Sequence, residues 1–167
     1  MKLVRTIVLT VALLATLAYF YTYVSGKEHL MREGELVLFE LAPLDPRSLM
    51  QGDYMQLRYS IGRYVPRDTF PDGGYLVFSK DGMGVARYIR VQGEPEPLAA
   101  GEHVIRFYRR ASTLFQSSRI ELGSSSYFFQ EGEGEKYAEA QYGGIRVDDS
   151  GDGVLVGLYD IDGQPIR

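Results

Sequence analysis

GDYMQLRY, at residues 52–59, is the stretch that decides the fold of this chain. Polar and apolar side chains alternate along it, as they do along a β-strand with one buried face. One face carries Tyr54, Gln56, Arg58 and Ser60. The other face, which we expect to lie in the core, carries Met55, Leu57, Tyr59 and Ile61. The alternation therefore predicts a strand from Asp53 to Ile61, with Tyr54 pointing away from the core.

A turn precedes this strand. The segment Asp45-Pro46-Arg47 contains an Asp-Pro step, which disfavours helix at Asp45 and initiates a turn. We expect Gly52 to relax the backbone where it enters the strand, and Asp53 to accept hydrogen bonds from the turn. Asp45, Arg47 and Glu131 are predicted to form a polar clasp around this region.

An apolar segment near the N-terminus predicts a transmembrane helix. Residues 6–24 (TIVLTVALLATLAYFYTYV) carry no charge. As a helix they span roughly 28 Å, enough for a hydrocarbon core of about 30 Å. Lys2 and Arg5 precede them, so the positive-inside rule places the N-terminus in the cytoplasm. This predicts a single-pass signal-anchor in the cytoplasmic (inner) membrane, with bilayer contact through residues 6–24 and a periplasmic domain.

Two alternatives to the anchor are open. A cleaved signal peptide would use Val24-Ser25-Gly26 as its cut site, but the apolar run is long and ends in bulky tyrosines. A buried core helix is the second alternative. We favour the uncleaved anchor, which divides the chain into a transmembrane segment at 1–26, a linker at 27–34 and a β-rich domain at 35–167.

The rest of the chain consists of short strands separated by turns. We predict strands at residues 35–41, 74–80, 85–92, 103–109, 117–122, 125–130, 145–147 and 154–159. Asp81-Gly82 and Gly123-Ser124 each predict a hairpin between the strands that flank them. A short helix is expected at 135–142, ended by Gly143-Gly144. The predicted fold class is mainly β, at the margin of α+β: an antiparallel sandwich or partly closed barrel with one short helix, preceded by the transmembrane helix.

Composition excludes several classes of function. The formal net charge is −4, which gives a nucleic-acid partner no electrostatic basis. There is no cysteine, which excludes disulfides and thiolate metal sites, and there are only two histidines. The acidic turn at 148–153 resembles the start of a calcium-binding EF-hand loop, but the twelfth position is Tyr159 instead of the required glutamate. We therefore predict no metal and no cofactor.

Candidates for catalysis are few. Asp53 and Glu131 would serve a carboxylate-dependent hydrolase only if the fold brought them into one cleft. A Ser–Lys dyad would need Ser48 beside Lys80 or Lys136. Sequence spacing fixes neither arrangement, so we assign no catalytic residue.

Arginines and tyrosines are interleaved along the middle of the chain. The arginines are Arg58, Arg63, Arg67, Arg87 and Arg90, and the tyrosines are Tyr59, Tyr64 and Tyr88. On adjacent strands they would form a flat face for a glycan or a partner protein. Ordinary cross-strand pairing on a solvated sheet is the simpler explanation.

The opening stretch resembles a known family. It fits the pattern Gly-Asp-Tyr-x-x-Leu-x-Tyr of the GDYXXLXY protein family, and the segments 45–47, 127–132 and 154–158 are similar to that family as well. The resemblance implies a bacterial membrane-anchored protein of a family without known function, often encoded beside multi-pass membrane proteins. It transfers Gly52, Asp53, Tyr54, Leu57 and Tyr59 as signature residues only. With Arg58 they form the motif face that we regard as the candidate functional face.

We predict from these observations a non-catalytic accessory or interaction module of a bacterial envelope membrane system, with a multi-pass membrane protein as a candidate partner. An envelope glycan or small-ligand binding domain is the main alternative. A carboxylate-dependent hydrolase is the weaker one.

Overall fold

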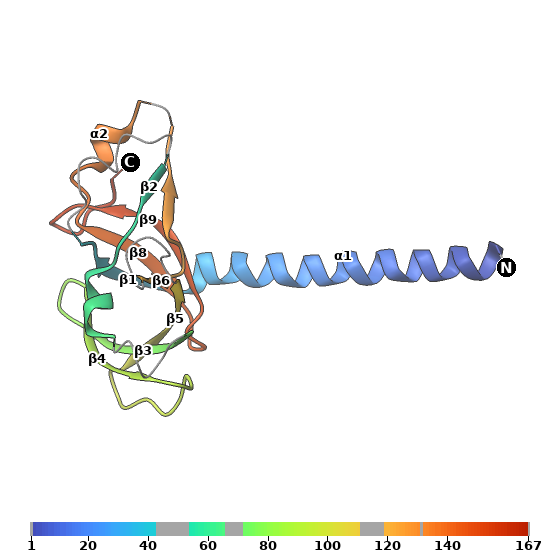
Figure 1. Ribbon diagram of the computed structural model, residues 1–167, viewed down its shortest axis with the longest axis horizontal. Coiled ribbons are helices and arrows are strands. Elements are labelled where there is room, and N and C mark those ends of the chain that lie inside the picture. The colour runs from blue at the N-terminus through green and yellow to red at the C-terminus, as the bar shows by residue number, and fades with distance from the viewer. Residues whose placement is uncertain (1, 43–53, 66–71, 111–118, 131, 167) are drawn as a thin grey trace.

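The computed structural model describes residues 2–42, 54–65, 72–110, 119–130 and 132–166. A long N-terminal helix leads into a domain in which these residues form nine strands and two short helices (Figure 1). The strands pair antiparallel in three sheets, and within the described part of the chain they do not close into a barrel. The prediction of a mainly β fold behind an apolar helix is confirmed.

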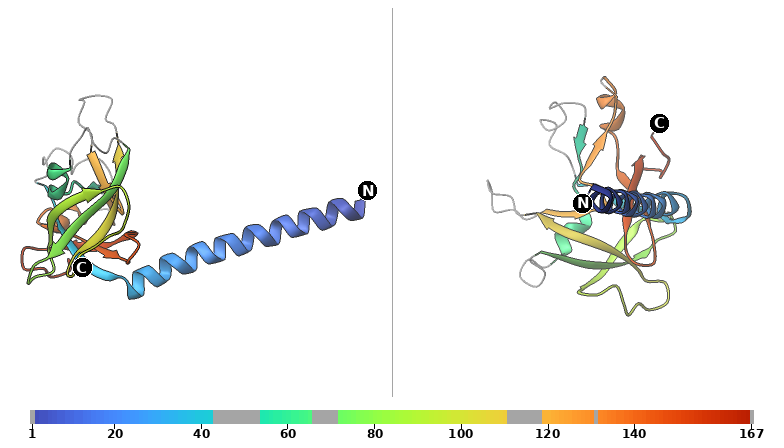
Figure 2. Two further views of the ribbon diagram at one scale, coloured as in Figure 1. Left: turned by 90° about the horizontal axis from the view of Figure 1, so that it is seen from below. Right: turned by 90° about the vertical axis from the view of Figure 1, so that its right-hand side faces the viewer.

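The N-terminal helix α1 spans Lys2–Glu33 and projects away from the domain (Figures 1 and 2). It is long and apolar enough to cross a membrane, and the most apolar part of it is not buried by the domain. The helix continues without a break through residues 27–33, so the segment predicted as a linker is helical.

The end of α1 is fixed to the domain by three contacts. Leu30 is 4% exposed. The ammonium group of Lys27 lies 3.2 Å from a carboxylate oxygen of Asp152. Arg146 donates from Nη1 to the carbonyl of Gly34 at 2.6 Å, which satisfies a backbone acceptor just beyond the helix end. The helix α1 and the domain are therefore joined through side chains as well as through the backbone.

Each sheet joins strands that are distant in sequence. The first sheet has the order β1–β8–β9, with β1 at Glu35–Glu40, β8 at Tyr142–Val147 and β9 at Gly153–Tyr159. The second pairs β2 (Tyr54–Gln56) with β7 (Ser126–Phe128). The third has the order β4–β3–β5–β6, with β3 at Gly73–Lys80, β4 at Ala86–Gln92, β5 at His103–Arg110 and β6 at Arg119–Leu122.

The core lies between the first and third sheets. Phe39 of β1 meets Phe78 of β3 edge to face, with ring centroids 5.3 Å apart. Ile105 and Phe107 of β5 are both fully buried. The predicted core face of the motif is confirmed, because Met55, Leu57, Tyr59 and Ile61 are all at most 6% exposed.

The hairpin predicted around Gly123-Ser124 is wrong. Both of its strands exist, but β6 pairs with β5 and β7 pairs with β2. Gly123 adopts φ +62°, where glycine is favoured, and the chain turns there. The carbonyl of Ser125 then accepts a hydrogen bond from the backbone N–H of Leu57 at 2.8 Å. Each of the two strands therefore pairs with another strand, β5 or β2, instead of with its neighbour across the turn.

The helix predicted at 135–142 is too long. The helix α2 spans only Gly134–Tyr137, and Gly143 and Gly144 lie inside the buried strand β8. A Cβ atom at Gly144 would clash with the ring of Tyr159, and one at Gly143 would lie 3.0 Å from Cε1 of Tyr59. These glycines make room for tyrosine rings and do not end a helix.

The motif strand is also shorter than predicted. The described strand ends at Gln56, and a 3-10 helix, η2 (Ser60–Tyr64), begins soon after it. Because η2 breaks the two-residue alternation, Ser60 is buried instead of exposed.

Candidate functional site

The motif strand ties two parts of the domain together. Tyr54, Met55 and Gln56 pair with Phe128, Tyr127 and Ser126. At the other end of the motif, Tyr59 forms an isolated antiparallel bridge with Leu41, just beyond β1. The motif therefore links the β2–β7 sheet to the β1–β8–β9 sheet.

Tyr59, the last residue of the motif, is buried in the core of the domain. Its hydroxyl donates to the carbonyl of Ser124 at 3.2 Å, and its ring meets Phe39 edge to face. Burial raises the pKa of the Tyr59 phenol well above its ordinary value. The phenol therefore stays neutral at physiological pH, so it cannot act as a tyrosinate base or nucleophile.

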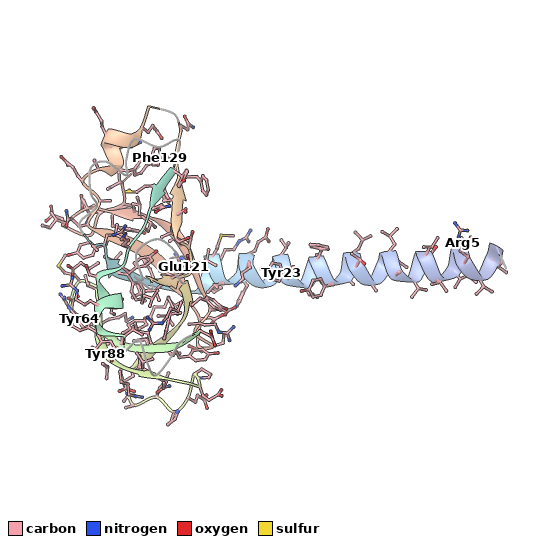
Figure 3. The ribbon with its side chains drawn as sticks, in the orientation of Figure 1. Arg5, Tyr23, Tyr64, Tyr88, Glu121 and Phe129 are labelled. Atoms are coloured by element: carbon pink, nitrogen blue, oxygen red, sulfur yellow. The ribbon has the colours of Figure 1, made fainter. Side chains whose placement is uncertain are left out.

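Tyr54 faces outward, as predicted. Its ring lies 5.7 Å from the ring of Phe128, the residue directly opposite it, and Phe128 is 74% exposed. Phe128 also lines a pocket of about 450 Å³ between α1 and the domain. The lining of this pocket, which we call the helix-end pocket, includes Tyr23, Lys27, Ser124, Tyr127, Phe128 and Leu155. Figure 3 shows Tyr23 on the part of α1 that leaves the domain. The exposed aromatic pair is thus next to the end of the apolar helix.

Several predicted site residues lie outside the described residues. They are Asp45, Arg47, Gly52, Asp53 and Glu131. The polar clasp and the Asp53–Glu131 carboxylate pair therefore stay predictions, as does a dyad that involves Ser48. Arg58 is described and exposed, and its carbonyl accepts a hydrogen bond from the N–H of Ala42.

Four residues of the predicted tyrosine–arginine face lie around one pocket: Arg63, Tyr64, Arg87 and Tyr88. Tyr64 of η2 and Tyr88 of β4 stack with ring centroids 5.3 Å apart and an interplanar angle of 21° (Figure 3). They line a pocket of about 340 Å³, which we call the tyrosine pocket. Its lining includes Glu40, Ser60, Arg63, Tyr64, Arg87 and Tyr88.

Other members of that face are elsewhere. Tyr59 is in the core, and Arg90 pairs with Glu102 and donates to the carbonyl of Pro97. Arg67 lies outside the described residues. Glu40 and Ser60 line the tyrosine pocket but were not predicted to do so. Their position beside the tyrosines depends on β1 packing near η2, which no local sequence pattern indicates.

A second polar pocket, of about 440 Å³, lies near the start of β1. Its lining includes Glu35, Glu96, Glu102, His103, Asp148 and Asp149. A carboxylate oxygen of Glu35 lies 3.0 Å from Nδ1 of His103, and Glu35 also pairs with Lys80. These contacts tie β1 to β3 and β5. No group of three acidic or histidine side chains in the described part of the chain converges as metal ligands would.

Comparison with known proteins agrees with the motif. A family model described as GDYXXLXY protein matches residues 16–158, which include part of the apolar helix and nearly the whole domain. Searches of curated proteins and of solved structures give no match. The motif, the apolar helix and the β domain that follows it identify this chain as a member of the GDYXXLXY family.

Proposed function

We propose that this chain is a single-pass protein of the cytoplasmic membrane of a bacterium, with its N-terminus in the cytoplasm and its β domain outside. In this proposal the domain is a non-catalytic accessory module that binds a membrane-embedded partner protein. The observation that carries the proposal is the exposed Tyr54–Phe128 pair beside the apolar helix.

The character of α1 supports the anchor. Its apolar stretch is uncharged over residues 6–24, follows Lys2 and Arg5, and ends in Tyr19, Tyr21 and Tyr23. Tyrosines favour the membrane interface, where the ring is partly buried and the hydroxyl is hydrated. The helix then continues through residues 25–33, where Lys27 already pairs with Asp152 of the domain and Leu30 is buried. The domain would therefore lie close to the lipid headgroups.

The position of the aromatic pair supports a partner within the membrane. Phe128 and Tyr23 line one pocket, so Phe128 lies near the level at which the apolar helix would leave the bilayer. Exposed aromatic side chains are enriched in protein interfaces and are costly to leave in water. A partner that reaches this surface would itself be in or on the membrane. A multi-pass protein with short external loops meets that condition.

Labelling of single cysteines tests the topology. Because the natural chain has no cysteine, Asp149→Cys and Lys2→Cys each create a unique thiol. In intact spheroplasts a membrane-impermeant maleimide should label position 149 and should label position 2 only after lysis. An intact mass of 18.8 kDa for the membrane-bound protein would show that the helix is retained. Cleavage near residues 24–26, or labelling of position 2 in intact cells, would refute the anchor.

Photo-crosslinking tests the partner. A benzophenone side chain at position 128 should give one protein adduct of defined mass that only detergent extracts from membranes. Tyr54→Ala should abolish this adduct. The control is benzophenone at Tyr108, a tyrosine that is 56% exposed and does not line the helix-end pocket. Adducts to lipid alone, or equal protein adducts at positions 128 and 108, would refute the proposed interface.

A further inference from the structure

The tyrosine pocket is on the far side of the domain from the helix. The 3-10 helix η2, which carries Arg63 and Tyr64, lies on the side away from α1 in two perpendicular views (Figures 1 and 2). If α1 is the anchor, the pocket faces the aqueous space and not the lipid. A ligand for this pocket is therefore a water-soluble molecule or a polymer outside the membrane.

The pocket contains an aromatic platform. Tyr64 is 55% exposed although it stacks on Tyr88. The stacking holds the ring of Tyr64 in a fixed orientation, which lowers the entropy cost of binding a second flat surface against it. The guanidinium carbon of Arg63 lies 5.9 Å from the centroid of the Tyr64 ring. Arg63 also donates from Nε to the carbonyl of Ser60 at 2.9 Å, which fixes its planar fork beside the platform.

The charges around the platform are balanced. Arg87 is held by two hydrogen bonds to a carboxylate oxygen of Asp81, at 2.7 and 3.0 Å. Among the lining residues of the tyrosine pocket, Glu40 is the acidic one. Two cations and two anions leave no net charge for an ionic ligand to neutralise. The arginines provide donors held in place by their hydrogen bonds, and Glu40 provides an acceptor, and both suit hydroxyl groups.

The floor of the pocket has an unsatisfied polar group. Ser60 lines the pocket and is 6% exposed, and its hydroxyl makes no hydrogen bond to any described residue. A buried hydroxyl without a partner costs free energy. Because the Ser60 oxygen is enclosed, the polar contacts available to a ligand come from the accessible side chains around it.

We propose that the tyrosine pocket binds an uncharged saccharide. One apolar face of a sugar ring packs on Tyr64, and its hydroxyl groups bond to Arg63 and Glu40. This site is separate from the Tyr54–Phe128 surface, so the two proposals can fail independently.

Binding is measured on the full chain in phospholipid nanodiscs. Maltoside detergents are avoided because their sugar headgroups would compete. The probes are the tetrasaccharide of N-acetylglucosamine and maltotetraose, with inorganic phosphate as the anionic probe. Tyrosine-ring NMR shifts should report saturable binding of at least one sugar with a Kd of about 1 mM or tighter, and no response to phosphate.

Variants locate the site. Tyr64→Ala should weaken binding by at least about tenfold, whereas Tyr64→Phe, which keeps the ring, should bind normally. Tyr108→Ala is the matched control, because Tyr108 is equally exposed and does not line the pocket. Arg63→Gln is a second variant with an exposed side chain and should also weaken binding.

Three results would overturn the proposal. They are no saturable binding of either sugar at about 10 mM, well above the expected Kd; sugar binding that is unchanged in Tyr64→Ala; and binding of phosphate alone.

Discussion

Replacing Gly143 with alanine should destabilise the domain through the motif tyrosine. The added Cβ would lie 3.0 Å from Cε1 of Tyr59, closer than ordinary van der Waals contact. Tyr59 cannot easily move away, because it is buried and its hydroxyl is bonded to Ser124. Overpacking of this kind costs about 1–3 kcal/mol, and replacing a strand glycine recovers about 0.5–1 kcal/mol. We therefore expect a net loss of about 1–2 kcal/mol and a fall in Tm of about 3–6 °C.

A double-mutant cycle tests the cause. Gly143→Ala should be costly in the Tyr59→Phe background, where the ring remains. It should be neutral or slightly stabilising in the Tyr59→Leu background, where the clashing ring atom is gone. The chain has 13 tyrosines and no tryptophan, so near-UV circular dichroism of tyrosine follows thermal unfolding of the full chain in nanodiscs. An equal cost of Gly143→Ala in both backgrounds would refute the reasoning.

Three further substitutions test other parts of the fold. The pKa of Asp81 is lowered by backbone N–H groups of its turn and by Arg87. The ionised form therefore stabilises the fold above about pH 4, and this contribution is lost as the pH falls; Asp81→Asn should reduce the acid-induced fall in Tm below that pH. Ser60→Ala should keep or raise Tm, because it removes an unsatisfied buried hydroxyl, and a fall above 3 °C, roughly 1 kcal/mol, would contradict that assignment. Arg146→Leu should speed trypsin cleavage within residues 27–34, because the carbonyl of Gly34 loses its partner; unchanged cleavage would show that this contact does not hold the junction.

Local patterns predicted the parts of the fold that local physics determines. The hairpin at Asp81-Gly82 is correct, and one carboxylate oxygen of Asp81 accepts from the N–H groups of Met83 and Val85 within the same turn. The alternating burial of residues 54–59 is correct because β2 lies on the core with one face exposed. The uncharged run at 6–24 predicted a long apolar helix, since such a run needs no tertiary partner to be recognised.

Long-range pairing was not predictable in the same way. The sequence around Gly123 is equally compatible with a hairpin and with two strands that diverge to β5 and β2. Which arrangement forms depends on the motif strand, far away in sequence. The roles of Gly143 and Gly144 likewise depend on distant residues, because Gly143 makes room for the ring of Tyr59 and Gly144 for the ring of Tyr159. The tyrosine pocket was predicted only as a set of residue types, since its concavity arises where β1, η2 and β4 meet.

The segment from Tyr54 to Tyr64 connects the two proposed surfaces. Tyr54 lies in the exposed aromatic pair near the apolar helix, and Tyr64 forms the platform on the far side of the domain. Between them, Leu57 and Tyr59 are buried and fix the segment to the core. The buried Tyr59 thus holds the backbone from which both outward tyrosines project. If so, Gly143→Ala should weaken saccharide binding and reduce cross-linking at position 128 together, whereas Tyr64→Ala should affect only the first. A Gly143→Ala protein that is destabilised but retains both activities at 25 °C would show that the two surfaces do not depend on the position of Tyr59.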